Sequence, residues 1–445
     1  MPWLEQNRLE WKKPEWILFL FTFLILLWFP LMNGYPFVYY DSWGYAGGYP
    51  GTSRSPVLGL LMRPAVVLGG PWGYALVQTA VTAFALVFLA NVVLGGKYKY
   101  SYYAALVVSG VGFISGYLMA DVWALIGFIC LFAMATGLSY PVIVVLFAIA
   151  CSAHYGNFPI FLATAGLFLF FARQKLKFIT LVACCLVGAL ALIYAGNLAA
   201  GQGKIRPRLT GWMTLAARIS TDMPELIDEK CARDPDFAFC RLTNEIHGWS
   251  EKKRYARLIW DGREQLNLSW GEFDQACKEF VLFSLRGHYG DQLAAIAQDT
   301  FRLLSHYDLR RGLYPNEGAW FFEAFKKHAP DGLPQYMSSW QQTGKFLPIF
   351  NRLKKPLALT FAGSMLLCLA YVVRYWKRRE QDIVVKLAAF ALIAILINAL
   401  FIATVNGPFV RFQARIGFLM FFPAAIVAAK ALAGLRAFKL FKRAG

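Results

Sequence analysis

Five residues suited to group transfer lie at the ends of apolar segments of this sequence. Asp41 stands in FVYYDSWGYAGG, Asp121 in GYLMADVWAL, His154 in SAHYGNF, and Arg411 and Arg415 in NGPFVRFQARIGF. A carboxylate or an imidazole can accept a proton from a hydroxyl group, and a guanidinium can balance the charge of a phosphate. This set of side chains therefore suits a reaction in which a hydroxyl displaces a phosphate.

Each of these residues also has a purely structural interpretation. Asp41 precedes Ser-Trp-Gly-Tyr, a pattern common at helix N-caps, and Asp121 can cap an apolar helix whose exposed amides favour an anion. His154 can be satisfied by backbone groups of its loop. Arg411 and Arg415 are four residues apart and can extend toward lipid headgroups. At this point both interpretations stay open.

The elements that must position these residues are those of a helical membrane protein. Of its 445 residues, 58% are hydrophobic, 16% aromatic and 16% charged, which is unlike a soluble globular chain. Apolar stretches of about 15 to 20 residues recur, and each can cross most of a bilayer core. We predict ten spans, at 16–31, 74–93, 102–118, 122–135, 140–151, 158–172, 176–198, 357–373, 383–403 and 416–432. No cleavage site of small residues follows the first stretch, so we predict a span rather than a signal peptide.

The basic residues predict the orientation of these spans. Clusters such as Lys97–Lys99, Arg173–Lys177 and Arg374–Arg379 fall on the side of both termini, whereas the opposite short loops carry only Arg54, Arg63, Arg411 and Arg415. Basic residues favour the cytoplasmic side, so both termini are predicted to be cytoplasmic. The five candidate residues then share the outer face. The net charge of +19 is distributed in these short clusters, which argues against a nucleic-acid partner.

Residues 140–172 allow two topologies. One kinked helix would reverse the orientation of everything after it, whereas two short helices would preserve it. The segment CSAHYGNFP carries the helix breakers Gly156, Asn157 and Pro159, and a single helix would put the basic RQKLK cluster outside. We therefore predict two helices, which are short for full spans and partly re-entrant if shielded by protein or a cavity.

The expected domains are an N-terminal transmembrane module, an extracytoplasmic domain and a C-terminal transmembrane module. The first covers 1–200, with about seven helices and a long outer loop at 33–73; the second covers 201–355; the third covers 356–445, with about three helices. The middle domain is more polar and has helical periodicity. Its Cys231 and Cys240 would form a disulfide in an oxidising compartment, the alternative being two free thiols.

The outer-face motifs resemble those of the GT-C superfamily of membrane glycosyltransferases. An Asp beyond the first span, then tyrosines, then Arg54-Ser55-Pro56 opening the surface helix PVLGLLMRPAVVL, is similar to the first outer loop of that superfamily. LMADVWALIGFICLFAM and VRFQARIGFLMFFPAAIVAA resemble the second outer loop and a late span of its mannosyltransferase and aminoarabinose-transferase branch. The resemblance covers most of 16–200 and the last thirty or so residues.

The resemblance implies a GT-C-like fold and transfer of one sugar from a polyprenyl-phosphate carrier. The acceptor would be a glycan, lipid or protein on the periplasmic face of a bacterial inner membrane. Asp41 would be the general base of an inverting reaction, with Asp121 and His154 as further catalytic candidates. The expected substrate-binding residues are Tyr40, Trp43, Tyr45, Arg54, Arg411 and Arg415. Aromatic rings would stack on sugar faces, and Arg206 and Arg208 are alternative partners for phosphate.

Two departures from the family pattern affect these expectations. Oligosaccharyltransferase-like members carry an Asp-x-Asp motif that holds a divalent metal, whereas here Asp121 is followed by Val122 and Trp123. One carboxylate makes a poor Mg²⁺ or Mn²⁺ site, so we expect no metal cofactor unless Asp41 and Asp121 share an ion. The long segment after the seventh span also differs from the short loop of the lipid-A-modifying members, which leaves the acceptor open.

Two other functions compete with this interpretation. An O-antigen polymerase or ligase-like enzyme also has a long outer segment, and its catalysis would depend on residues such as His306, Arg310 and Arg311 in SHYDLRRGLYPNEG. A transporter or flippase should have charged residues within spans, broken helix pairs and internal symmetry. The polar residues here gather instead at the outer ends. Asn267-Leu268-Ser269 would be a glycosylation site if the compartment were the endoplasmic reticulum.

Overall fold

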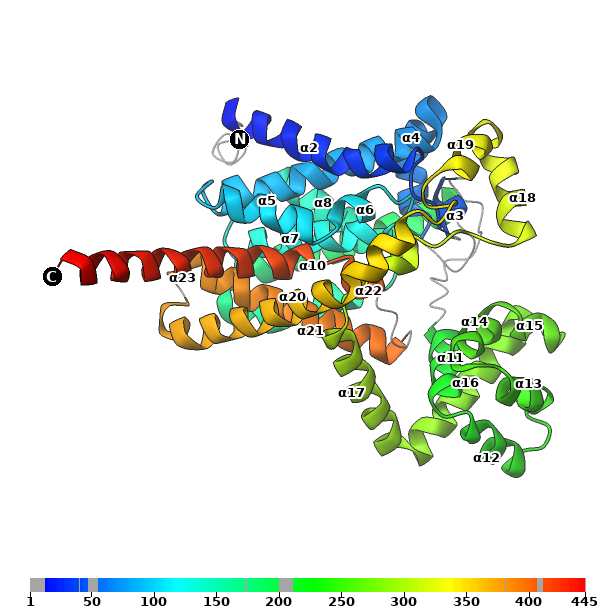
Figure 1. Ribbon diagram of the computed structural model, residues 1–445. Helices are drawn as coiled ribbons and strands as arrows, with labels where there is room; N and C mark the ends of the chain where they lie inside the picture. Colours follow the sequence, from blue (N-terminus) through cyan, green and yellow to red (C-terminus); the bar gives the residue numbers. More distant parts are fainter. Residues whose placement is uncertain are drawn as a thin grey trace. The chain divides into compact units, whose positions relative to one another are not determined.

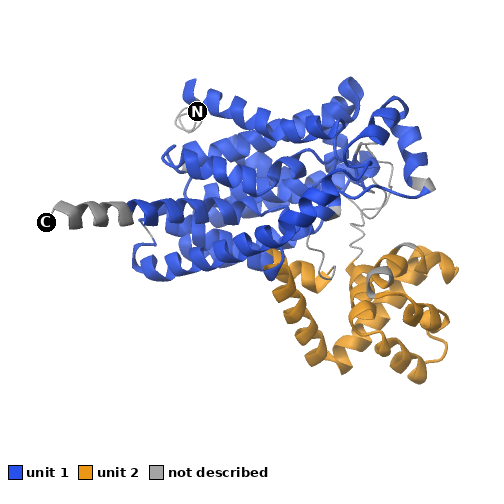
Figure 2. Cartoon of the chain, viewed as in Figure 1, with its two compact units in different colours: residues 1–205, 305–397, 410–445 blue, residues 206–304, 398–409 orange. Residues whose placement is uncertain are grey.

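A computed structural model describes residues 13–39, 41–46, 55–172, 174–199, 211–379, 381–405 and 411–444. Within these ranges the regular elements are helices, and the one isolated pairing of extended backbone joins Phe37 to Tyr117. The chain divides into two compact units (Figure 2): unit 1 comprises Met1–Ile205, Ser305–Ile397 and Val410–Gly445, and unit 2 comprises Arg206–Leu304 and Asn398–Phe409. The predicted all-α class is confirmed.

Unit 1 contains the long apolar helices (Figure 1). Its N-terminal part has α2 (Lys13–Asn33), α3 (Ser42–Ala46), α4 (Val57–Val87), the π-helix η1 (Phe88–Val93), α5 (Lys99–Val108), α6 (Val111–Ser115), α7 (Asp121–Ala135), α8 (Pro141–Ala153), α9 (Asn157–Phe168), η2 (Leu169–Phe171) and α10 (Lys175–Ala199). Its later part has η4 (Arg310–Gly312), α18 (Ala319–His328), η5 (Pro330–Gly332), α19 (Leu333–Ser338), α20 (Phe346–Tyr375), η6 (Trp376–Arg378), α21 (Ile383–Val405, whose end is assigned to unit 2), α22 (Arg411–Ala414) and α23 (Phe418–Ala444).

The lengths of these helices identify an all-α membrane protein. Five described helical segments, Lys13–Asn33, Val57–Asn91, Lys175–Ala199, Phe346–Arg378 and Ile383–Val405, are long and apolar enough to cross a bilayer. Shorter apolar helices cover Asp121–Ala135, Pro141–Ala153, Asn157–Phe171 and Phe418–Ala433. The number of ten spans and their orientation stay predictions.

Three local features compare directly with the sequence-based expectations. Residues 140–172 form two helices, α8 and α9, with His154 in an extended conformation between them, which confirms the two-helix interpretation. The expected span at 102–118 is interrupted, because Gly110 adopts a left-handed conformation with φ 61° between α5 and α6. The helix expected after Pro56 is present as the first part of α4, which is non-helical at Gly69 and Gly70; its place at the membrane surface stays a prediction.

The boundary between the units differs from the expected domain at 201–355. Unit 2 ends at Leu304, and residues from Ser305 onward pack within unit 1. Buried amide side chains explain this division. Gln341 donates to the carbonyl oxygens of Val38 (2.6 Å) and Gly312 (3.0 Å) and accepts from the Val38 N–H (3.1 Å). Asn316 also donates to the Val38 carbonyl (2.9 Å). These bonds attach the segment after Ser305 to the first loop.

Replacing Gln341 with leucine is expected to destabilise unit 1 by about 2–4 kcal/mol, because burial leaves the Val38 amide and the Gly312 carbonyl without that partner. The measurement is the thermal unfolding midpoint of the purified full chain. Gln335→Leu, at an exposed position of α19, is the matched control and should unfold as wild type does. Equal midpoints for the two variants would contradict the role assigned to Gln341.

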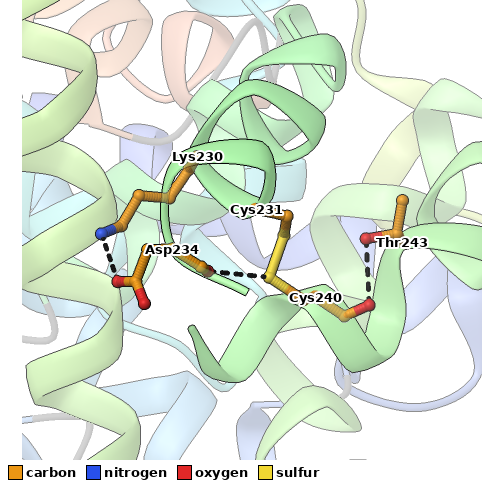
Figure 3. The surroundings of a disulfide bond; sticks show 5 residues. All are labelled: Lys230, Cys231, Asp234, Cys240 and Thr243. Carbon is orange, nitrogen blue, oxygen red and sulfur yellow. Dashed lines mark hydrogen bonds and ion pairs between the residues drawn. A yellow bond between two sulfur atoms is a disulfide. The ribbon is translucent and has the colours of Figure 1, made fainter. Parts of the chain in front are cut away.

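Unit 2 is a small helical bundle around an apolar core. Its helices are α11 (Gly211–Asp222), α12 (Glu225–Arg233), η3 (Ala238–Leu242), α13 (Thr243–Gly248), α14 (Glu251–Trp260), α15 (Gly262–Gln265), α16 (Trp270–Gly287) and α17 (Tyr289–Ser305). Phe239, Phe273 and Phe280 are almost fully buried in this core. The predicted Cys231–Cys240 disulfide is present and joins α12 to η3 (Figure 3). The adjoining Lys230 and Asp234 form an ion pair at 2.7 Å.

Replacing Cys231 and Cys240 with serine is expected to lower the stability of unit 2 by about 2–3 kcal/mol, because the bridge restricts a short loop of the unfolded chain. Thermal unfolding with and without a thiol reductant checks this. Wild-type protein should shift to the variant's midpoint when reduced, while the variant should not respond. A wild-type protein insensitive to complete reduction would argue against a stabilising bridge.

Candidate functional site

The first loop and the second outer turn are joined by backbone hydrogen bonds. The Phe37 N–H donates to the Gly116 carbonyl (3.0 Å), and the Leu118 N–H donates to the Phe37 carbonyl (3.0 Å). Gln78, which is fully buried on α4, donates to the carbonyl of Tyr117 (2.5 Å) and so holds the turn from the other side. Asp41 follows Phe37 by four residues, and Asp121 follows Tyr117 by four. The bridge therefore brings both acids to one region of unit 1.

Arg411 packs against the ring of Tyr39, and its charge interacts with those of both acids. Its guanidinium carbon is 4.1 Å from the centre of that ring, which is a cation–π contact. Burial by itself would lower the pKa of Arg411, but the charge of Asp121, with smaller contributions from Tyr39 and Asp41, raises it above its ordinary value. Arg411 therefore carries a permanent positive charge beside two of the predicted catalytic carboxylates.

Arg415 is the second cation of this region and is only 4% exposed. Burial lowers its pKa to about 10, and the charge of Asp121 works in the opposite direction. A guanidinium with this pKa is still protonated at neutral pH. Asp121 is the first residue of α7 and 8% exposed, so the helix N-terminus also favours its negative charge. Asp121 thus offsets part of the positive charge of both arginines.

These residues line a cavity in unit 1. Its walls are Phe113, Ile114, Tyr117, Met119, Asp121, Asp308, Leu309, Gly312, Arg411, Ala414 and Arg415. The space open to the centres of water molecules is about 20 Å³, little more than one water needs. Among the buried wall atoms without a hydrogen-bond partner in the described part of the chain are the donors Tyr117 Oη and Arg411 Nη1. They are available to an anionic or hydroxylated ligand once the cavity opens.

The segment from Tyr307 to Gly312 forms one wall of this cavity. Tyr307 donates to the carbonyl oxygens of Ser109 and, at 3.4 Å, of Ala414. Asp308 accepts from Arg310 at 2.7–3.0 Å in a two-pronged pair, which neutralises its charge. Position 312 needs glycine because the backbone there lies close to Tyr117, and a Cβ atom would be 2.0 Å from Tyr117 Oη. This segment closes the space beside Asp121 and the two arginines.

Four sequence-predicted residues, Asp41 among them, are not on the cavity walls. Trp43 is 4% exposed, and its ring packs 4.4 Å from Phe325 and parallel to His328, so in this conformation its faces are covered by protein. Tyr45 is 1% exposed and likewise packed. His154 Nδ1 accepts a hydrogen bond from the Gly156 N–H (3.0 Å). A backbone group of its own loop therefore satisfies this histidine, as its structural interpretation expects. The structure does not bring His154 to the cavity.

Two further predicted residues, Tyr40 and Arg54, lie outside the described residues, as do Arg206 and Arg208. Conversely, Tyr117 and Asp308 belong to the cavity, although sequence reasoning did not select them. The concentration of charged residues in SHYDLRRG is the sequence feature that could have pointed to Asp308. No comparable signal marks Tyr117, because tyrosine is frequent along the whole chain.

Among the described residues there is no group of three or more His, Cys, Asp or Glu side chains placed to hold a metal ion. The expected independence from a metal cofactor stays a prediction. Comparison of the chain with protein-family models, with curated proteins and with solved structures finds no match.

Proposed function

We propose that this protein is an inverting membrane glycosyltransferase. It would move a sugar from a polyprenyl-phosphate-linked donor to a hydroxyl of a glycan, lipid or protein acceptor on the periplasmic face of a bacterial inner membrane. One observation supports this most: Asp121, Arg411 and Arg415, from segments far apart in sequence, line one cavity, and the charge of Asp41 reaches Arg411. A carboxylate base beside a pair of guanidinium groups suits displacement of a phosphate by a hydroxyl.

In the proposed reaction Asp41 takes the proton of the acceptor hydroxyl. The hydroxyl oxygen forms a bond to the anomeric carbon of the donor sugar, while the bond from that carbon to the phosphate oxygen breaks. The electron pair of the broken bond stays on the polyprenyl phosphate, which leaves as an anion. Attack from the face opposite the phosphate inverts the anomeric configuration.

Arg411 and Arg415 would balance the charge that develops on the leaving phosphate. The cavity walls carry two guanidinium groups and two carboxylates, Asp121 and Asp308. Because Arg310 neutralises Asp308, the walls keep an excess of positive charge. An excess of positive charge in a buried site favours an anion more than it would in water. Asp121 in this scheme positions the arginines rather than exchanging protons.

The size of the cavity requires a conformational step. Space for about one water molecule cannot hold a sugar, so donor entry must displace part of a wall. The segment from Tyr307 to Gly312 is one of the walls without a regular helix of more than one turn, and hydrogen bonds from Tyr307 hold its first residue in place. We expect this wall to move when the donor binds.

A polymerase or ligase-like enzyme acting on polyprenyl-linked glycans is the second candidate. The observation that favours it is the presence of Asp308 on the cavity wall, paired with Arg310, in the segment where such an enzyme would carry its catalytic arginines. Arg310→Gln separates the two functions. If the leading proposal holds, the substitution mainly shifts Asp308 and lowers turnover only several-fold. If Arg310 is instead a catalytic residue of a polymerase or ligase, the substitution lowers turnover about 10²-fold or more.

The direct test is an assay of the purified full chain in vesicles containing a polyprenyl-phosphate sugar donor and candidate acceptors. The proposal expects free polyprenyl phosphate and a product of inverted anomeric configuration. Movement of intact donor between leaflets without bond cleavage would instead support a flippase. Absence of both products and movement across a panel of donors would contradict the glycosyltransferase proposal.

A further inference from the structure

Helix α17 of unit 2 exposes an apolar stripe along its length. Tyr289, Leu293 and Phe301 are 60%, 48% and 74% exposed, and Ala297, at the remaining position of the series, is exposed as well. Residues four apart lie on the same side of a helix, so these four side chains form one continuous surface, the α17 apolar face. An exposed helix surface in a soluble domain is ordinarily polar.

The buried side of α17 carries polar side chains that take part in the packing of unit 2. Gln292, Asp299 and Thr300 are only 1%, 8% and 8% exposed. Gln292 accepts a hydrogen bond from the buried Arg218 and donates to Ser284 Oγ at 2.7 Å. These bonds between α17, α11 and α16 fix the rotation of α17 about its axis. On this side α17 buries these polar side chains together with Leu303, while its apolar face stays exposed.

The chain connects this helix directly to Tyr307, a buried residue of unit 1. Six residues after Phe301, Tyr307 donates to the carbonyl of Ser109, just after α5, and to that of Ala414, just before the apolar part of α23. Six residues span at most about 20 Å even when fully extended. At about 1.5 Å per residue, Leu293 is only about 12 Å further along α17. The length of the chain therefore limits how far the α17 apolar face can lie from Tyr307.

We propose that the α17 apolar face binds the outer surface of the lipid bilayer, with its side chains at the boundary between headgroups and acyl chains. Helices that lie in this interface present aromatic and aliphatic residues to the lipid and polar residues to the protein or water. The remaining side of α17 fits this arrangement, because Asp291 and Gln298 line a polar cavity of unit 2 together with Glu229 and His288. The proposal concerns unit 2 alone and does not depend on the transferase activity.

Nitroxide labelling of the full chain in vesicles of phosphatidylethanolamine and phosphatidylglycerol tests it. The test variant is Leu293→Cys, and the matched control is Gln298→Cys, an exposed position on the same helix about 140° away around its axis. Both carry Cys184→Ser, because Cys184 is the exposed free cysteine among the described residues. The label at 293 should have a several-fold higher ratio of collision with lipid-soluble oxygen to collision with a water-soluble nickel chelate than the label at 298.

Each other outcome overturns the proposal. Equal ratios at 293 and 298 would place both positions in water. Protection of the 293 label from both oxygen and nickel would mean that protein, such as a second copy of the chain, covers this face. Phe301→Cys repeats the measurement on the same face, so that a local effect of one substitution is recognised. Formation of the Cys231–Cys240 bridge in each variant checks that unit 2 is folded.

Discussion

Replacing Asp41 with asparagine is expected to lower sugar transfer by about 10²–10⁴-fold, the usual contribution of a general base. Asparagine has almost the same size but cannot accept the proton of the acceptor hydroxyl. Donor binding should be retained, because the arginines proposed to bind the phosphate are unchanged. Turnover and donor affinity measured on the same membrane preparations separate these two effects.

This substitution also distinguishes catalysis from helix capping. Asp41 precedes α3, and asparagine caps helices about as well as aspartate does, so a purely structural role predicts nearly wild-type turnover. Asp331→Asn, at an exposed acid of η5 in the same unit, is the matched control and should leave turnover unchanged. Wild-type turnover in Asp41→Asn would remove Asp41 from the proposed mechanism.

Replacing Arg411 with glutamine should have the second largest effect, a loss of about 10²–10³-fold in turnover, as is typical for removal of one preorganised donor to a developing anion. Its Nη1 atom is buried on the cavity side without a hydrogen-bond partner among the described residues, and its charge is held beside Asp121. Arg411→Lys should recover only part of this loss, because an ammonium group cannot form a planar two-pronged contact with phosphate.

The matched control for Arg411 is Arg352→Gln, at an exposed position on α20. It removes the same charge from unit 1 without touching the cavity and should leave turnover unchanged. If Arg411→Gln weakened only the thermal stability and not the turnover of folded protein, the role of Arg411 would be restricted to neutralising Asp121. Binding of farnesyl phosphate compared with farnesol reports whether the phosphate contact is lost.

Much of the local structure could be predicted from the sequence, since it depends on short-range patterns. Apolar runs specify helices of the length that a bilayer core demands, and the breakers around Gly156 specify two helices in place of one. The nine-residue step from Cys231 to Cys240 made their disulfide predictable. The candidate residues Asp121, Arg411 and Arg415 were also identifiable, because polar side chains at the ends of apolar segments stand out locally.

Only the tertiary structure decided which distant segments complete the cavity. The residues after Ser305 read as part of a polar outer domain, yet Gln341 and Asn316 bind the backbone of Val38 some 300 positions away. Trp43, expected to face a sugar, is covered by Phe325 and His328. Hydrogen bonds and ring contacts between such distant residues leave no periodicity in the sequence. The local pattern of apolar residues therefore predicted the helices, whereas long-range pairing of buried polar groups determined the walls of the site.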